Sequence, residues 1–148
     1  GMKSTRERLE GFCDALEKHG CKPARDMLAR GAYTFESGME CTHTLLENPN
    51  PPTAIFASND EMAVGAINAA REMGLKVPED LSVAGFDDSM LASRIMPALT
   101  TIRRPVREMA RLATTKLIAS IDGRHEDARA GNMLVPELVT RNSTRSID

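Results

Sequence analysis

The chain has 148 residues, a length that fits one globular domain, and its 19 basic and 21 acidic side chains give a formal net charge of −2. This balance provides no overall electrostatic attraction to nucleic acid or to an anionic membrane surface. Aromatic residues make up only 3% of the chain, so a binding site built on stacked aromatic rings has little to draw on.

The three cysteines lack a CxxC spacing and the three histidines lack a zinc-ligand spacing. We therefore expect a reduced, cytoplasmic protein that holds no metal and no other cofactor. No part of the sequence approaches the roughly 18 consecutive apolar residues of a membrane-spanning helix, so no membrane partner is expected.

Apolar residues along the chain switch between two patterns. Spacings of three and four residues predict helices, and short apolar runs bounded by turn residues predict strands buried on both faces. In chain order the predicted elements are a helix from residue 4 that ends at Gly20, an apolar run at 27–29 that could form a strand, a helix at 35–46, a strand at 53–57, a helix at 58–73, a strand at 81–86, an irregular or short helical segment at 91–96, a strand at 99–102, a helix at 105–121 and a last strand within 133–140. Their alternation with short links predicts an α/β fold, with a parallel sheet, right-handed crossovers and helices on both faces.

Local signals define some boundaries of these elements. Ser4 and Glu7 fit a capping box at the start of the first helix, and Ser58 and Glu61 fit another at the start of the third helix. Pro136 has no backbone N–H, which restricts the last strand to an edge of the sheet or to a start at this residue.

Polar clusters follow two of the predicted strands. Ser58, Asn59 and Asp60 follow one strand, and Asp87 and Asp88 follow the next. Ligands of open parallel sheets bind beyond the carboxyl ends of the strands, so neighbouring strands would bring Asn59 and Asp87 to one rim. An amide beside a carboxylate can donate to and accept from the hydroxyls of a polyol.

Two other interpretations of these clusters are open. Ser58, Asn59 and Asp60 could only cap the following helix, and Asp87 with Asp88 could only begin a turn. Capping explains Asp87 less well, because no strong helix starts there. The pair at 87 and 88 could also hold a divalent metal in an enzyme. We expect no enzyme, because no nucleophile, base or phosphate-binding glycine loop occurs at a suggestive spacing.

Long stretches of the chain resemble the LacI/GalR-type transcriptional regulators. The matching segments are PTAIFASNDEMA at 52–63, GLKVPEDLSVAGFDD at 74–88, PALTTIRRP at 97–105, LVPELVTR at 134–141, RERLEGF at 6–12 and FESG at 35–38. The resemblance implies a fold similar to periplasmic sugar-binding proteins, in which two α/β lobes close around a small effector. It implies that residues 1–148 form the C-terminal lobe, and that the helix at 105–122 packs on the first lobe.

The resemblance also implies which side chains contact the effector, a sugar or related metabolite. The residues that it assigns to the ligand cleft are Arg6, Tyr33, Asn59 and Asp87. The strand pattern selects Asn59 and Asp87 independently. For Arg6, the sequence alone favours a solvated position in the first turn of a helix.

Apolar faces predict contacts with a second copy of the chain. Without the first lobe, the stripe on the helix at 105–121 would be exposed, and we expect it to pack against a partner. The stripe residues are Val106, Met109, Ala113 and Leu117. The resemblance implies a further dimer surface at Val64, Ile67, Ile95 and Met96, with burial in the core of the chain as a nearly equal alternative for Val64 and Ile67.

The predicted function is therefore ligand sensing within a LacI-type transcriptional regulator. A homodimer would contact operator DNA only through an N-terminal head that lies outside this chain. The alternative is a periplasmic-type solute-binding protein of a transport system. The cysteines and the segments at 58–60 and 85–88 favour the regulator.

Overall fold

The computed structural model describes residues 3–21, 24–124, 131 and 133–146. A sheet of four strands, β1 (Ala54–Phe56), β2 (Ser82–Asp87), β3 (Thr100–Arg103) and β4 (Glu137–Val139), has the spatial order β1-β2-β3-β4. The first three strands are parallel, and β4 pairs antiparallel with β3 at the edge. The open, mostly parallel sheet confirms the predicted fold class, and β4 starts directly after Pro136, as expected.

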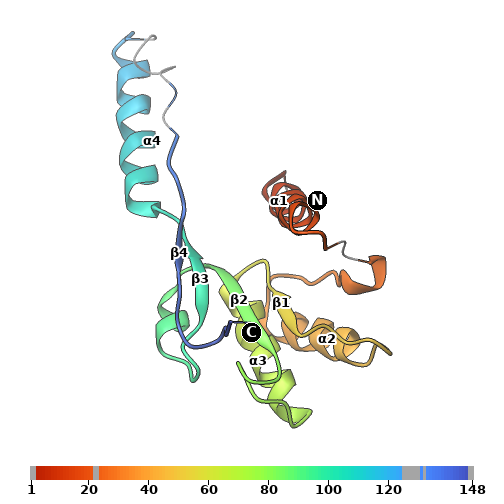
Figure 1. Ribbon diagram of the computed structural model, residues 1–148. Helices are drawn as coiled ribbons and strands as arrows, with labels where there is room; N and C mark the ends of the chain where they lie inside the picture. Colours follow the sequence, from red (N-terminus) through yellow and green to blue (C-terminus); the bar gives the residue numbers. More distant parts are fainter. Residues whose placement is uncertain (1–2, 22–23, 125–130, 132, 147–148) are drawn as a thin grey trace.

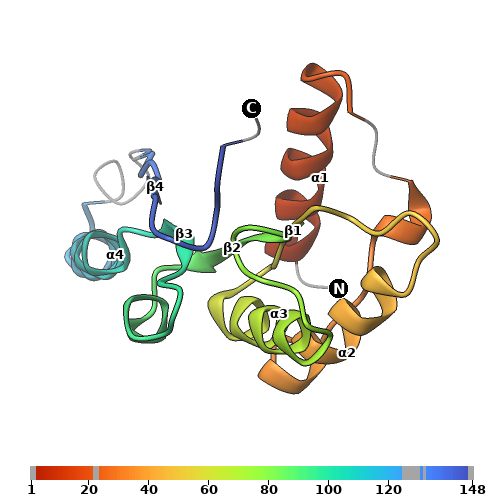
Figure 2. The same ribbon diagram turned by 60° about the horizontal axis from the view of Figure 1, so that its bottom comes forward.

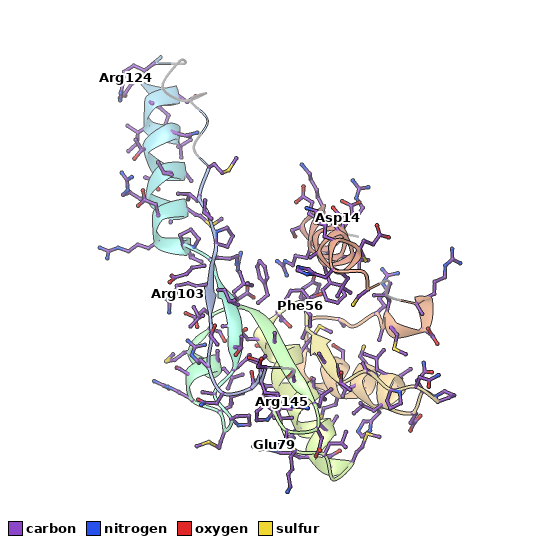
Figure 3. All side chains as sticks on the ribbon, in the orientation of Figure 1. Asp14, Phe56, Glu79, Arg103, Arg124 and Arg145 are labelled. Atoms are coloured by element: carbon purple, nitrogen blue, oxygen red, sulfur yellow. The ribbon has the colours of Figure 1, made fainter. Side chains whose placement is uncertain are left out.

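In the described part of the chain, the helices are α1 (Lys3–Lys18), α2 (Phe35–Leu46), α3 (Asp60–Glu72) and α4 (Val106–Ile121), with two short 3-10 helices, η1 (Arg25–Met27) and η2 (Met90–Ser93). Figure 2 shows α2 and α3 side by side on one side of the sheet and α1 on the other side. Helix α4 points away from the rest of the molecule, with Arg103 near its base and Arg124 at its far end (Figures 1 and 3).

The hydrophobic core lies between the sheet and α2 with α3. Its fully buried members include Ala63, Ala66, Leu81, Val83 and Leu99. Small residues on α3 let its backbone approach its neighbours closely, and glycines let α2 and α3 touch directly. A Cβ atom on Gly65 would lie 2.2 Å from the backbone oxygen of Phe35.

Helices α1 and α4 bury little of their apolar surface. No α1 residue is fully buried, and the ring of Phe12 stacks on Phe56 of β1 with 5.6 Å between centroids. The side chain of Phe56 lies on the side of the sheet that faces α1 (Figure 3). On α4 the side chains of Leu117 and Ile121 are 62% and 75% exposed. The predicted exposure of the α4 stripe is therefore present in this chain.

The apolar run at 27–29 does not form a strand. The N–H of Met27 donates to the carbonyl of Ala24, and the N–H of Leu28 donates to that of Arg25, which closes the η1 turn. These local bonds use donors that a strand would need for a neighbour.

The structure does not place the helix caps of α1 and α3 at the residues that the two predicted capping boxes name. Helix α1 already includes Lys3, so Ser4 lies inside the helix and does not cap it. The cap of α3 is Asn59 and not Ser58, because Asn59 Oδ1 accepts the N–H of Met62 at 3.0 Å. Among the described residues, no helix has the length and apolar character required to cross a membrane.

Candidate functional site

Strands β1 and β2 are neighbours, as the site prediction required. Ile55 lies opposite Val83 in a parallel pairing, and the N–H of Ala57 donates to the carbonyl of Ala84 at 2.8 Å. The chain therefore leaves both strands at the same edge of the sheet. The segments that begin at Ser58 and at Asp87 both lie at this rim.

Asn59 connects α3 to the backbone at Tyr33, and Tyr33 in turn contacts α1. Its Oδ1 caps α3, and its Nδ2 donates to the backbone carbonyl of Tyr33 at 3.0 Å. Tyr33 has a positive φ of 66°, and its hydroxyl lies 2.5 Å from Thr5 Oγ1 on α1. The predicted site residues Asn59 and Tyr33 are therefore adjacent, and both lie close to α1.

Asp87 ends β2 in a conformation that L-residues rarely adopt. Its φ is 123°, and the following Asp88 also has a positive φ, of 54°. Each such residue costs on the order of 1–3 kcal/mol, so the surrounding structure must hold this turn. The Asp87 side chain is 29% exposed and pairs with Arg104, with 2.8 Å between Oδ1 and Nε. This contact is an ion pair without a well-directed hydrogen bond.

Asp88 has a different role from Asp87. Its carboxylate is only 10% exposed and accepts from Arg103 Nε at 2.6 Å and from Arg141 Nη2 at 2.5 Å. Burial opposes its ionisation, but the bonds from Arg141 and Arg103 outweigh burial and hold the pKa of Asp88 below its usual range. Two arginines thus occupy the second carboxylate that a metal-dependent enzyme would need. In the part of the chain that the structure describes, no three potential ligands among His, Cys, Asp and Glu gather as a metal site would require.

The lowered pKa of Asp88 makes stability depend on pH in the acid range. A depressed pKa contributes stability above the ordinary value of about 3.9, and this contribution is lost as the pH falls through the lower folded-state value. Asp88→Asn is expected to cost about 2 kcal/mol at pH 7, the range of hydrogen bonds to charged groups. The difference from wild type should shrink below pH ~4. Thermal unfolding from pH 3 to 7 measures this, with the exposed Asp14→Asn as control.

Helix α1 presents Arg8, and not Arg6, to the rim. The guanidinium of Arg8 lies 4.2 Å from the ring centroid of Phe86, and its Nη1 donates to the carbonyl of Ser58 at 2.5 Å. The Arg6 side chain is 74% exposed and pairs with Glu10 one turn further along the same helix. Sequence reasoning missed Arg8, although its spacing of four residues from the apolar Phe12 was a usable signal for an inward face.

Two cavities adjoin this rim. The larger, of about 1150 Å³, lies between α1 and the sheet, and Arg8, Tyr33, Ser58 and the ring of Phe56 are part of its wall. Arg6 is also part of this wall. The smaller cavity, of about 390 Å³, is lined by Phe86, on which Arg8 stacks, and by Arg104, the partner of Asp87. The walls of these cavities therefore include the guanidinium groups of Arg8 and Arg104 and aromatic residues, and Asp87 and Asn59 are bonded to wall residues without being part of either wall.

The residues predicted for a dimer surface fall into two groups. Ile67 is 3% exposed and belongs to the core, and Ile95 packs against the core. Their contacts are within the chain, which is the alternative considered for Ile67. Val64 is half-buried, and the exposed members are Met96, Val106, Met109, Ala113 and Leu117.

Comparison with protein families matches residues 1–144 to the periplasmic binding protein-like domain. The chain belongs to this family. Its sequence is 40% identical over 148 residues to the probable HTH-type transcriptional repressor ExuR of Bacillus subtilis, an alignment that covers 99% of this chain and 44% of ExuR.

Solved structures place this periplasmic binding protein-like domain among LacI-type regulators. The transcriptional repressor AscG of Escherichia coli matches with a TM-score of 0.85 and 37% identity, over 98% of this chain and 52% of AscG. The lac repressor dimer bound to operator and the anti-inducer ONPF matches with a TM-score of 0.85 and 34% identity, over 97% of this chain and 49% of that repressor. The resemblance to LacI/GalR-type regulators is thereby confirmed.

The domain spans about half the length of the proteins it matches. The aligned part is the effector-binding portion of these repressors. The relatives are transcriptional regulators and not enzymes or transport proteins, which supports the regulator over the solute-transport alternative.

Proposed function

We propose that this chain is the C-terminal effector-binding lobe of a LacI-type transcriptional repressor that acts in the cytoplasm. The observation that supports this most strongly is the convergence of Asn59, Asp87 and Arg8 at the carboxyl ends of two neighbouring parallel strands. This is the edge at which open α/β sheets bind ligands. Operator binding and repression belong to a longer protein, because the relatives are about twice as long.

The chemistry of the rim suits a small, hydroxylated metabolite. The Asp87 carboxylate accepts hydrogen bonds from hydroxyls, and the Arg8 guanidinium donates to hydroxyl or carboxylate oxygens. Tyr33, whose backbone carbonyl accepts from Asn59, is part of the wall of the larger cavity. We assign ligand contacts to Asp87, Arg8, Tyr33 and Asn59, and we place Arg8 in the role that the resemblance implied for Arg6.

A bound effector would act on the repressor by linking separate elements. Arg8 joins α1 to the backbone at Ser58, which follows β1. Asn59 joins α3 to the backbone at Tyr33, in the segment before α2 that we call the Tyr33 loop (residues 28–34). A metabolite that bonds to these groups and to a second lobe favours one relative lobe orientation by its differential affinity. We propose that the exposed side chains of Met96, Val106 and Leu117 contact either that lobe or a second copy in a homodimer.

A thermal-shift screen of the full-length protein tests this function. The panel contains monosaccharides, disaccharides, sugar acids and nucleosides, because each class carries hydroxyls that Asp87 could bind. A compound that binds the native state raises the Tm, by an amount that grows with the logarithm of its concentration above the Kd. A panel that gives no shift, together with intact operator binding that no compound alters, would refute effector sensing.

Arg8→Ala and Arg6→Ala form a matched pair on the same helix. Arg8→Ala should weaken binding of the compound found in the screen by about 10- to 100-fold, because a charged donor is lost. Arg6→Ala should change binding by less than about twofold, since an exposed i,i+4 pair contributes little. Isothermal titration of both variants measures this, and equal effects would contradict the assignment of Arg8.

A further inference from the structure

The turn after β2 has an unusual backbone that needs an external support. Asp87 and Asp88 both have positive φ, and neither is a glycine. Two consecutive residues of this kind persist only when neighbouring groups determine their conformation. The direction of the Asp87 carboxylate depends on this backbone, so whatever supports the turn also orients that side chain.

Asp60 supplies the support from the first turn of α3. Its side chain is almost completely buried, at 1% exposure. Oδ2 accepts the backbone N–H of Ser89 at 2.6 Å, and Oδ1 accepts the hydroxyl of Thr101 at 2.5 Å. A buried carboxylate is tolerated only when such bonds replace water. Gly85 provides the space, because a Cβ there would lie 2.6 Å from Asp60 Oδ1.

Thr101 extends this support by one residue. Its Oγ1 donates to Asp60 and also accepts the backbone N–H of Asp88 at 3.4 Å. Asp60 therefore holds both N–H groups that follow Asp87, the one of Ser89 directly and the one of Asp88 through Thr101. The three anchored elements are α3, β3 and the turn after β2.

The same end of α3 holds the other half of the rim. Asn59 precedes Asp60 in the chain and caps α3, so the two neighbouring residues anchor the Tyr33 loop and the Asp87 turn. The distance between Asn59 and Asp87 is thereby tied to one helix end. A multipoint hydrogen-bonding site requires such a fixed geometry.

We propose that Asp60 and Thr101 are positioning residues that orient the Asp87 carboxylate for effector binding. This proposal rests on the proposed function of Asp87 as a ligand contact. Neither residue touches the metabolite, since both are buried beneath the rim. Their action is on the backbone conformation of Asp87 and Asp88.

The first test measures the turn itself and needs no ligand. In NMR spectra of the 148-residue chain, three-bond HN–Hα couplings and Cα shifts should report positive φ at Asp87 and Asp88 in wild type. Thr101→Val removes the bridging hydroxyl with little change in shape, and it should move both signatures toward ordinary negative φ. The amide of Ser89 should lose its hydrogen-exchange protection in Asp60→Asn. Unchanged signatures and protection in both variants would overturn the proposal.

A matched control separates positioning from loss of stability. Ser143 is also fully buried, and its hydroxyl donates to the carbonyl of Val83 and accepts from the N–H of Thr100. Ser143→Ala thus deletes a hydroxyl that bridges β2 and β3, but away from the Asp87 turn. It should lower the Tm as much as Thr101→Val does and leave the Asp87 signature unchanged. Thr101→Ser, which keeps the hydroxyl, should restore that signature.

The second test measures affinity for the compound that gives the largest thermal shift with the wild-type full-length protein. Thr101→Val should weaken its binding about tenfold, the change expected when one bond to the Asp87 carboxylate is lost, and Ser143→Ala should not. A displaced turn with unchanged affinity would contradict the ligand role of Asp87 and leave the positioning of the turn confirmed. If Thr101→Val and Ser143→Ala both lose affinity to the same extent, the loss follows from lower stability, and the positioning role in binding is refuted.

Discussion

Gly65→Ala is expected to lower the free energy of unfolding by about 3 kcal/mol, the upper range for overpacking of a core. A Cβ at this position would lie 2.2 Å from the backbone oxygen of Phe35 and 2.9 Å from the backbone N of Met39. Backbone atoms of α2 cannot rotate away as a flexible side chain can. The two helices must therefore separate, which opens the core that supports Asn59 and Asp60 at the end of α3.

Gly11→Ala is the matched control for this prediction. Gly11 lies inside α1. Apart from the backbone of α1 itself and the two neighbouring residues, no atom lies within 4 Å of the Cβ that alanine would add. Alanine there should raise stability by up to about 1 kcal/mol through helix propensity. Urea unfolding measures both variants. Similar stabilities for Gly65→Ala and Gly11→Ala would show that α2 and α3 do not touch through their backbones.

Asp87→Gly is expected to abolish most effector binding without destabilising the fold. Removing the carboxylate deletes hydrogen bonds from ligand hydroxyls, and two such bonds to a charged acceptor correspond to a loss of about 100-fold or more in affinity. Glycine adopts a φ of 123° freely, whereas alanine there is strained. Asp87→Gly should therefore be about 1 kcal/mol more stable than Asp87→Ala. Isothermal titration and thermal unfolding measure the two quantities.

Asp87→Gly and Asp87→Ala differ only in the freedom of the backbone at this position. Both variants lose the contact with Arg104, so their difference in stability reports the backbone alone. Equal stability of the two would mean that the turn relaxes to negative φ when the side chain is changed. Wild-type affinity in Asp87→Gly would show that the metabolite does not contact this carboxylate.

Helices α1 and α4 leave most of their side chains exposed to solvent. Helix α1 has no fully buried residue, and α4 has one, Ala119. Figure 1 shows α4 extended away from the sheet, and its apolar side chains include Leu117 at 62% exposure. That the helix at 105–122 packs on a further lobe stays a prediction.

Sequence patterns alone predicted the parallel strands and the polar residues that follow two of them, and the structure supplied the sheet order. Short apolar runs alternating with helices require parallel strands, and parallel neighbours deliver their carboxyl ends to one edge. Asn59 and Asp87 are therefore expected at one rim if their strands are neighbours, and the pairing of β1 with β2 meets this condition. The expectation needs only chain order and burial pattern, which are local properties of the sequence. The family resemblance rests likewise on continuous segments of the chain.

Only the tertiary structure decided between adjacent or similar residues. Arg8 contacts Ser58 and Phe86 at the rim, and Arg6 pairs with Glu10 of its own helix, because α1 lies on the sheet through Phe12, a contact between residues 44 positions apart. Asp87 stays partly exposed beside Arg104 and Asp88 is nearly buried, because Arg141 arrives from a segment 53 residues further on and binds Asp88. Ile67 belongs to the core because α3 packs against the sheet with that face.

The same physical reason applies to each of these assignments. Side-chain direction within a helix or turn depends on which face packs and on the local φ, and both are set by contacts distant in sequence. Asp60 shows this most clearly: its position after Asn59 suggests only a helix start. Its burial against Thr101 and Ser89, which makes it the support of the Asp87 turn, exists only in the folded chain.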